Sequence, residues 1–384
     1  MGVESSSSLG PSEAEIQSPE DEKSVERRKL LERIYGDWIE LGLYPQSLIQ
    51  GGNLIEYADE NLGAVKGRPF AVVQVIRQDP SVPNALLEEM IYKVRTEKDP
   101  NRDGWKEIMF LRTIAPWFHE QLPEDLRSQI AFPDVIDSRD EGDYTFCLQE
   151  YIEGEISGTV WDVKPEVLTK ESLETTIRFI RSFHEILTLE NVQALEPNMP
   201  VRQTDIYRDY ENYINWKQIP IPGLLGEEYF EKMRNQLEES RDLIAQAPLQ
   251  FTANDINPAN IIKMADGRLG MIDWERAHTV KDPAKDYGFV LADLWADPEL
   301  QKYYYERVVA ENQDIPHFAE FLRLDFIYRH SPAPINHFLP FIDNPDESIR
   351  SYARRAVEQT CQNLKDAIDQ KGMWAQKGHP NNET

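Results

Sequence analysis

Two short, adjoining segments in the C-terminal half of this chain concentrate acid and amide side chains at the ends of apolar runs. The first covers residues 252–262 and holds Asp255 and Asn260, and the second covers residues 269–275 and holds Asp273. An Asp-Gly dipeptide, which is typical of tight hairpin turns, separates the two apolar runs. A hairpin over this stretch places Asn260, at the entrance of one strand, close to Asp273, at the exit of the other. We therefore expect the three polar side chains to converge.

Convergence of these groups predicts the chemistry of phosphoryl transfer. Mg²⁺ prefers a few hard oxygen ligands from protein, with phosphate and water completing its shell, and one amide plus one carboxylate supply such ligands. We expect Asn260 and Asp273 to hold this ion and Asp255 to accept the proton of an attacking hydroxyl. The alternative is an ordinary surface hairpin with polar ends, since Asp and Asn are common turn residues. Each residue alone fits that alternative, whereas their joint order and spacing favour a catalytic site.

The segment 251–288 resembles the Brenner-type motif of the aminoglycoside phosphotransferase and choline kinase families, which have a protein-kinase-like fold. Those families carry His-Gly-Asp-x-x-x-x-Asn, then Ile-Asp-Trp/Phe-Glu, then Gly-Asp-Pro-x-x-Asp-Leu. Asp255, Asn260, Asp273 and Asp286 fall into register with that pattern. The resemblance implies that Asp255 is the catalytic base, that Asn260 and Asp273 are metal ligands, and that Asp286 braces the loop backbone from a following helix.

The same resemblance implies an α+β, bilobal protein-kinase-like fold, with a small antiparallel-sheet N-lobe and a larger, mainly helical C-lobe. It implies an Mg²⁺-dependent small-molecule kinase that moves the γ-phosphoryl group of ATP to a hydroxyl of its substrate, with GTP as an open alternative. Aminoglycosides, choline, ethanolamine, macrolides, sugars and amino alcohols all remain open as the acceptor.

Two departures from the family pattern concern the loop and an upstream strand. Ala253 and Asn254 replace the family's His and Gly before the catalytic Asp, which bears on the rigidity of the loop more than on its chemistry. Upstream, the strand pattern over 69–77 places Gln74 where the family's third strand carries a Lys or Arg for the α/β-phosphates. Gln donates a hydrogen bond but carries no charge, so either Arg77 substitutes through a shifted register or nucleotide binding is weakened.

The other nucleotide-binding predictions rest on position along the chain. Gly51 and Gly52 are expected to cover the phosphates, although an ordinary tight turn fits them equally well. Glu107 lies on a helical apolar pattern and resembles the helix-borne Glu that pairs with the strand cation, with a solvated helix face as the alternative. A buried strand leads into a hinge-like segment, where the resemblance implies that the backbone of Glu150 and Ile152 binds the adenine edge.

Composition and pattern divide the chain into five regions. These are a disordered polar leader at 1–24, an N-terminal helix at 25–43, the N-lobe at 44–150, the C-lobe at 151–370 and a flexible tail at 371–384. Within the N-lobe, residues 83–94 are expected to form an extra amphipathic helix.

The charge balance limits the partners of this chain. The sequence has 41 Lys and Arg against 68 Asp and Glu, a net charge of −27, which repels nucleic acid and anionic membrane surfaces and favours a cationic small molecule. Two cysteines fit no disulfide scaffold, and no apolar run is long enough for a signal peptide or a membrane span. These features predict a cytoplasmic setting. The oligomeric state is left open.

Two helical regions, 206–216 and 293–299, combine aromatic and acidic residues and are candidates for the acceptor pocket, although core packing accounts for any single aromatic there. A rival function is a catalytically silent nucleotide- or ligand-binding module on the same fold, motivated by Gln74 and by the altered pair before Asp255. Retention of the base and both metal ligands speaks against it. A protein kinase is disfavoured because no activation segment ending in Ala-Pro-Glu follows Asp273.

Overall fold

The structure is a computed structural model of the chain. It describes a few positions between 33 and 45, then residues 70–77, 88–96, 103–140, 144–158, 167–215 and 221–375. The chain divides into two compact units, and each is considered by itself. The smaller unit comprises Met1–Pro100 and Arg139–Leu148, and the larger comprises Asn101–Ser138 and Gln149–Thr384.

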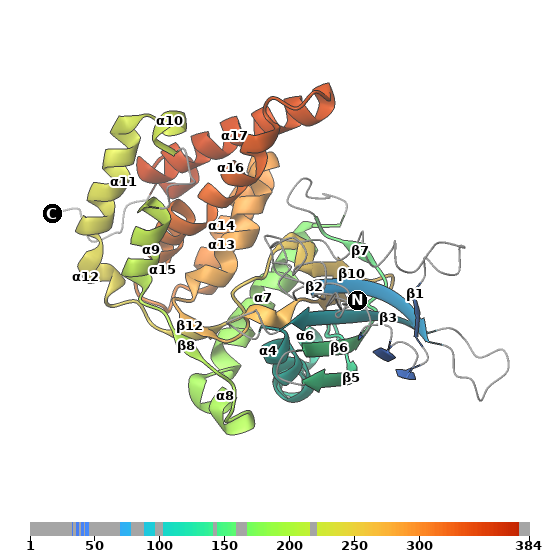
Figure 1. The fold of residues 1–384 in the computed structure, drawn as a ribbon. Coiled ribbons are helices and arrows are strands. Elements are labelled where there is room, and N and C mark those ends of the chain that lie inside the picture. The colour runs from blue at the N-terminus through green and yellow to red at the C-terminus, as the bar shows by residue number, and fades with distance from the viewer. Residues whose placement is uncertain are drawn as a thin grey trace, which may run out of the picture. The chain divides into compact units, whose positions relative to one another are not determined.

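The chain has a five-stranded sheet (Figure 1). Its order is β1 (Leu43–Pro45), β2 (Phe70–Arg77), β3 (Glu88–Thr96), β6 (Tyr144–Glu150) and β5 (Val135–Asp140). Of these strands, β1, β2, β3 and most of β6 belong to the smaller unit. β2 and β3 pair antiparallel along their whole length, with Gln74 opposite Ile91. The described positions between 33 and 41 are helical, in the region where the N-terminal helix was expected.

Strand β3 corrects the prediction of an extra helix at 83–94, which was wrong. The side chains of Met90 and Tyr92 are buried, whereas that of Glu89, which directly precedes Met90, is exposed. This alternation has a period of two residues, as in a strand with one buried face. Pairing with β2 overrides the helical propensity of the flanking Glu, Met and Lys residues, since strand formation depends on neighbouring strands more than on local preference.

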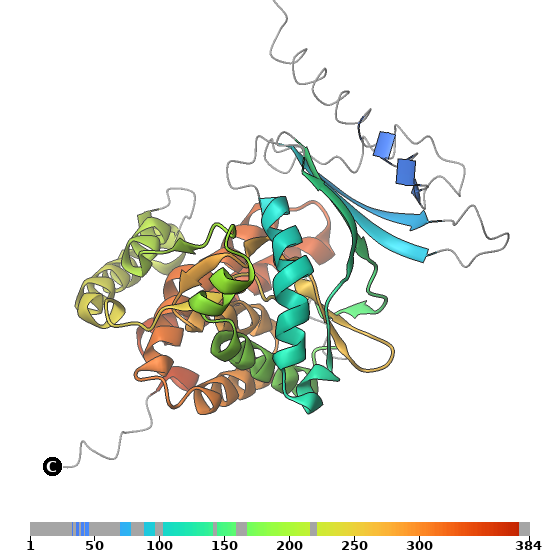
Figure 2. The same cartoon turned by 90° about the horizontal axis from the view of Figure 1, so that it is seen from below.

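A continuous helical stretch opens the larger unit, as Figure 2 shows in teal. It consists of α4 (Asp103–Met109), a π-helical turn η1 (Phe110–Ile114) and α5 (Ala115–Gln121). Phe110, Ile114 and Phe118 are fully buried and belong to the same core as the helices further along the chain. Residues 101–138 therefore belong to the larger unit, whereas the sequence-based division had placed them in an N-lobe at 44–150.

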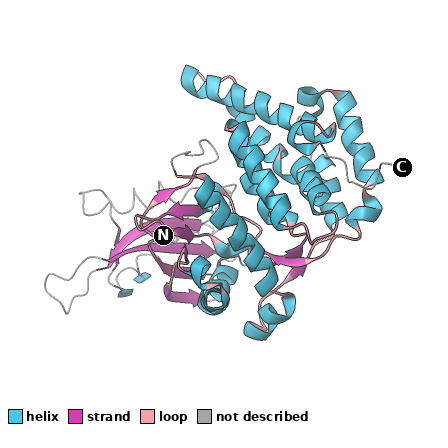
Figure 3. Cartoon of the chain, turned by 180° about the vertical axis from the view of Figure 1, so that it is seen from behind, coloured by secondary structure: helices cyan, strands magenta, loops and turns pink. Residues whose placement is uncertain are grey.

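Helices make up most of the larger unit (Figure 3). After α5 they are, in chain order, α6 (Glu124–Arg127), α7 (Lys170–Ile186), α8 (Leu189–Leu195), α9 (Ile206–Asn215), α10 (Ile221–Leu225), α11 (Glu227–Glu239), α12 (Arg241–Ile244), α13 (Ala284–Asp293), α14 (Pro298–Glu311), α15 (Phe318–Asp325), α16 (Pro332–Phe338) and α17 (Glu347–Ile368). Short 3-10 or π-helical turns η2 to η7 lie between or after them. No described helix is long and apolar enough to cross a membrane.

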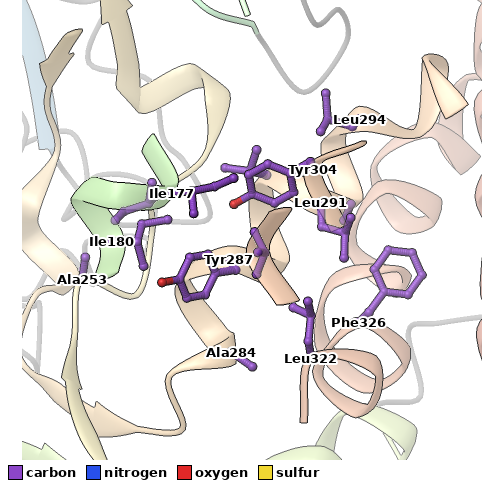
Figure 4. Packing of buried hydrophobic residues seen from close by; sticks show 14 of the residues in the cluster. Ile177, Ile180, Ala253, Ala284, Tyr287, Leu291, Leu294, Tyr304, Leu322 and Phe326 are labelled. Atoms are coloured by element: carbon purple, nitrogen blue, oxygen red, sulfur yellow. The ribbon is translucent and has the colours of Figure 1, made fainter. Parts of the chain in front are cut away.

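Helix α7 illustrates how the sequence sets these elements. Thr169 caps its N-terminus by accepting a hydrogen bond from the amide of Ser172. Leu173, Ile177 and Ile180 recur at helical spacing and are fully buried. They pack into one core with apolar side chains from α13, α14 and α15, several of which Figure 4 shows at close range.

The core extends past the predicted C-lobe end at residue 370. The turn η7 (Gly372–Trp374) buries the Trp374 side chain, whose ring lies 4.8 Å from that of Tyr305 and 4.9 Å from that of Phe326. The start of the predicted flexible tail is therefore an ordered part of the core, as far as the described residues extend.

Two small sheets position the polar loops of the larger unit. One has the order β4 (Ile130–Ala131), β11 (Leu269–Met271), β10 (Ile261–Lys263) and β7 (Glu155–Ile156). The other has the order β8 (Arg202–Gln203), β12 (Thr279–Lys281) and β9 (Gln250–Thr252). The predicted hairpin is the antiparallel pair β10 and β11, with Ile261 opposite Met271.

Candidate active site

The β10–β11 hairpin brings together the three side chains on which the functional prediction depends. Asn260 directly precedes β10, and Asp273 follows β11 by two residues. The Ile272 amide donates to the Asn260 carbonyl over 3.1 Å, which ties the two loops together at this end of the hairpin. Asp255, Asn260 and Asp273 all line one small cavity of about 10 Å³. The expected convergence is therefore present, while the roles assigned to these residues remain predictions.

Local hydrogen bonds fix the loop that carries Asp255. Asn257 caps the 3-10 turn η2 (Pro258–Asn260) by accepting from the Ala259 amide over 2.9 Å. Its own Nδ2 donates to Asp255 Oδ1 over 3.0 Å. Asn260 Nδ2 donates to the Asp255 carbonyl over 2.9 Å, which leaves Asn260 Oδ1 as the atom suited to a cation.

The electrostatic surroundings of Asp255 oppose its ionisation. Burial raises the pKa of this carboxyl, the Arg276 guanidinium lowers it, and the nearby Asp273 carboxylate raises it again, so that the net pKa lies above the ordinary value. Arg276 Nε lies 3.6 Å from Asp255 Oδ2. A carboxylate with an elevated pKa is a better proton acceptor than a free Asp, which suits a general base.

Two residues beside the cavity have left-handed backbone conformations. Asp273 has φ 64° and ψ 61°, and Asn254 has φ 66°. Asn is, after Gly, among the residues that adopt this conformation most readily. The replacement of the family's Gly by Asn254 therefore keeps the backbone geometry that the loop requires.

The carboxylate of Asp286 braces the loop from α13. Its two oxygens accept the backbone amides of Ala253 and Asn254 over 2.9 and 2.6 Å. His184 Nε2 lies 2.9 Å from Asp286 Oδ2, and both side chains are buried. The predicted bracing role of Asp286 is confirmed, and the buried His184 orients this carboxylate from α7.

A group of carboxylates lies beside Asp273. Glu107, Asp273 and Glu275 each place one oxygen within 4.8 Å of the others, and Glu107 is only 1% exposed. The predicted helix-borne Glu107 thus lies next to the predicted metal ligand, and the alternative of a solvated helix face is excluded. Hard, negatively charged oxygens at such spacing suit Mg²⁺, so the residues present fit the ion that the family implies.

The strand that was expected to carry the phosphate-binding side chain is β2. Gln74 and Arg77 lie on β2, and β3 is the last described strand before α4, which carries Glu107. Lys93 lies on β3, on the face opposite Met90 and Tyr92. Because the sequence analysis read this strand as a helix, it did not consider Lys93 as a second candidate for the phosphate-binding cation.

The remaining nucleotide-site residues stay predictions. Gly51 and Gly52 lie outside the described residues. The Glu150 amide donates to the Asp134 carbonyl over 2.9 Å, so this N–H is already used and does not face an adenine edge. The Ile152 side chain is buried against Gly270, where an added Cβ would come within 2.6 Å of it.

The two predicted acceptor regions differ in what their acids and aromatics do. In α9, Asp209 accepts from Arg329 Nε over 3.0 Å, and Tyr210 is buried beneath the same guanidinium. Trp295 is buried and its ring packs against Phe338 at 5.8 Å, so it belongs to the core. Asp293 differs, because burial and then the charge of Asp255 raise the pKa of its carboxyl to about 7.

The fold and the assembled loop define the chain as a member of the protein-kinase-like class. The model of the phosphotransferase enzyme family, APH, matches residues 98–322, which is more than half of the chain. The chain therefore belongs to this phosphotransferase family, and the resemblance seen in the sequence is confirmed.

Solved structures support the same fold at low sequence identity. The GDP complex of wild-type aminoglycoside 2'-phosphotransferase-IIIa is 15% identical with a TM-score of 0.50, over 76% of this chain and 89% of that chain. An aminoglycoside phosphotransferase from Alicyclobacillus acidocaldarius subsp. acidocaldarius is also 15% identical with a TM-score of 0.50, over 84% and 97% of the two chains. The GDP and kanamycin complex of APH(2")-IIia is 13% identical with a TM-score of 0.50, over 81% and 97%. No curated protein sequence matches the chain.

Proposed function

We propose that this chain transfers the γ-phosphoryl group of ATP or GTP to a hydroxyl of a small molecule, with Mg²⁺ as cofactor. The observation that carries the proposal is that Asp255, Asn260 and Asp273 line a single cavity. Membership of the phosphotransferase family supports the reaction class. GDP in two of the similar structures supports a nucleotide as the phosphoryl donor.

In this proposal Asp255 orients the acceptor hydroxyl and takes its proton. Its Oδ1 is held by Asn257, so the carboxylate presents Oδ2 to the substrate in one orientation. Arg276, 3.6 Å from Oδ2, is close enough to neutralise negative charge that gathers on the transferring group. Positioning and charge stabilisation together account for most of the catalysis expected of a phosphotransferase.

The cation would be held by Asn260 Oδ1 and the Asp273 carboxylate, and bound Mg²⁺ would neutralise charge on the phosphate oxygens. Gln74, on β2, remains a proposed phosphate-binding residue, and Lys93, on the last described strand before α4, is a second candidate that carries a positive charge. The Glu150 carbonyl and the Ile152 backbone remain the proposed partners of the nucleotide base. Phosphate coverage by Gly51 and Gly52 also remains proposed.

The acceptor is proposed to be a hydroxylated amine. Burial and then the charge of Asp255 raise the pKa of the Asp293 carboxyl, so a second carboxyl is electrostatically coupled to the base, and an ammonium group would stabilise both charges. Kanamycin in one similar structure and the net charge of −27 are consistent with a cationic substrate. A silent binding module loses one of its two motives, because Asn254 keeps the left-handed conformation of the loop.

The test compares Asp255→Asn with Asp273→Asn, with exposed Asp242→Asn as the matched control. Asp255→Asn should lower kcat by about 10² to 10⁴ while nucleotide binding in Mg²⁺ stays near that of the parent. Asp273→Asn should weaken Mg²⁺-dependent nucleotide binding itself, measured by calorimetry. A panel of hydroxylated amines and sugars supplies the acceptor. Full turnover in both variants would end the catalytic assignment.

A further inference from the structure

The larger unit contains a second, much larger cavity of about 370 Å³. This volume lies in the range of small-molecule sites. Its walls come from the η1–α5 stretch, from β4 and the residues after it, from the end of β6 and the segment after it, and from the turn between β10 and β11. It shares no lining residue with the cavity around Asp255.

The floor of this cavity is apolar. Leu111, Ala115, Ile130 and Ile152 are buried side chains that contribute to it. Phe132 is half-buried and lines the cavity, while its ring packs 5.3 Å from that of Trp274. Such a floor stabilises an apolar or aromatic body by removing it from water.

The polar lining of the cavity is unbalanced in charge. Glu120, Asp134 and Glu150 line it and are exposed, and none of these carboxylates pairs with a basic side chain among the described residues. Arg268 is the only Lys or Arg in the described lining, and Asp266 already neutralises it over 2.7 Å. The uncompensated charge is therefore negative, so the potential inside the cavity favours a cation.

The β10–β11 hairpin separates this cavity from the candidate active site. Asn260 and Asp273 lie at one end of the hairpin, and Met264 and Arg268 lie at its turn and line the second cavity. The Met264 amide donates to the Arg268 carbonyl over 2.9 Å and closes the turn. A ligand at the turn therefore occupies a site distinct from the one that holds the reacting groups, while Glu150 and Ile152, whose backbone is the proposed partner of the nucleotide base, also line this second cavity.

We propose that this cavity is a binding site for an organic ammonium compound with an aromatic or compact aliphatic body. The body lies on the floor around Phe132 and Ile152, and the ammonium group faces Glu120, Asp134 and Glu150 at the rim. This proposal does not depend on the catalytic function, since it concerns binding alone.

Binding of benzyltrimethylammonium, a permanent cation, tests the proposal against 3-phenylpropanoate, an anion with a similar body. Ligand-observed NMR on the full chain should show affinity for the cation at least about tenfold higher. The paired change Glu120→Gln with Asp134→Asn should weaken cation binding by at least about fivefold. The charge-matched control, Glu124→Gln with Glu190→Gln, alters two exposed carboxylates outside the cavity and should bind as the parent does.

A second variant, Ala131→Leu, fills part of the cavity without changing charge and should also weaken binding. Circular dichroism establishes that each variant is folded. Equal affinity for the two probes, or the same loss in the control pair as in Glu120→Gln with Asp134→Asn, would overturn the proposal. Stoichiometric displacement of the cation by Mg²⁺ and ATP would also overturn it, because the cavity would then belong to the nucleotide site.

Discussion

The Asp286 carboxylate accepts the backbone amide of Asn254 over 2.6 Å, so a helix side chain fixes the loop immediately before the proposed base. The partner carboxylate oxygen takes the neighbouring amide and faces His184. The Asp286 carboxylate is buried, and its hydrogen-bond partners are groups of the loop and of helix α7. Its replacement is costly because buried donors would be left without an acceptor.

Asp286→Asn should therefore destabilise the fold and slow turnover. The amide side chain can accept at only one atom, and its NH₂ group would face a backbone N–H. We expect a loss of about 2 to 4 kcal/mol in the free energy of unfolding. Urea denaturation measures it, with Asp242→Asn on the exposed face of α12 as control. Parent-like stability would show that the loop does not depend on this carboxylate.

The backbone of Asn254 gives a second prediction. Its φ of 66° suits Gly, and its side-chain Oδ1 is buried without a hydrogen-bond partner. Asn254→Gly should therefore leave stability and kcat near the parent values, whereas Asn254→Ala should cost about 1 to 2 kcal/mol. Thermal unfolding of the two variants separates these outcomes. An Ala variant as stable as the Gly variant would mean that the left-handed conformation is not required.

The sequence could predict those parts of the site that depend on contacts between residues close together in the chain. The hairpin with Asn260 and Asp273 at its ends is local, since apolar pairs flank a turn dipeptide, and the structure has it as predicted. The position of Asp255 followed from the family motif. The bracing by Asp286 spans more than thirty residues and came from that motif alone.

Interactions between distant segments escaped the sequence analysis. The pairing of β3 with β2 depends on sheet order, and residues 83–94 carry Glu, Met and Lys, which favour a helix when taken alone. Asp209 was assigned to an acceptor pocket, but it pairs with Arg329, 120 positions away, in a buried ion cluster. Neither Asp209 nor Arg329 lies in a local sequence pattern that predicts the other as its partner.

The strand assignment leads to a third prediction. Lys93→Met should lower kcat/KM for the nucleotide by about 10²-fold, because the positive charge proposed to neutralise the phosphates is lost. Gln74→Met should lower kcat/KM less, since Gln carries no charge. Steady-state kinetics with the nucleotide varied measures both. A large loss in the Gln74 variant alone would restore the original assignment.

The Asp293 carboxyl gives a prediction of pH dependence. Its pKa is about 7 in the folded chain, raised from 3.8 first by burial and then by the charge of Asp255. Between pH 4 and 7 the folded state therefore binds more protons at this site than the unfolded state, so the contribution of Asp293 to stability falls as pH rises through this window. Below pH 4 the Asp293 carboxyl is protonated in both the folded and the unfolded state, so it does not lower the stability of the fold.

Asp293→Asn should remove the loss of folding stability that ionisation of the Asp293 carboxyl causes. The variant should match the parent near pH 4 and exceed it above pH 7 by on the order of 2 kcal/mol. If Asp293 faces a cationic acceptor, the same variant should raise KM for hydroxylated amines above pH 7 and leave KM for neutral sugars unchanged. Urea denaturation across the pH range and kinetics with both acceptor types measure the two effects. A stability difference that does not change with pH would show that the Asp293 carboxyl titrates like an exposed one, and the argument for a cationic acceptor would then lose its electrostatic basis.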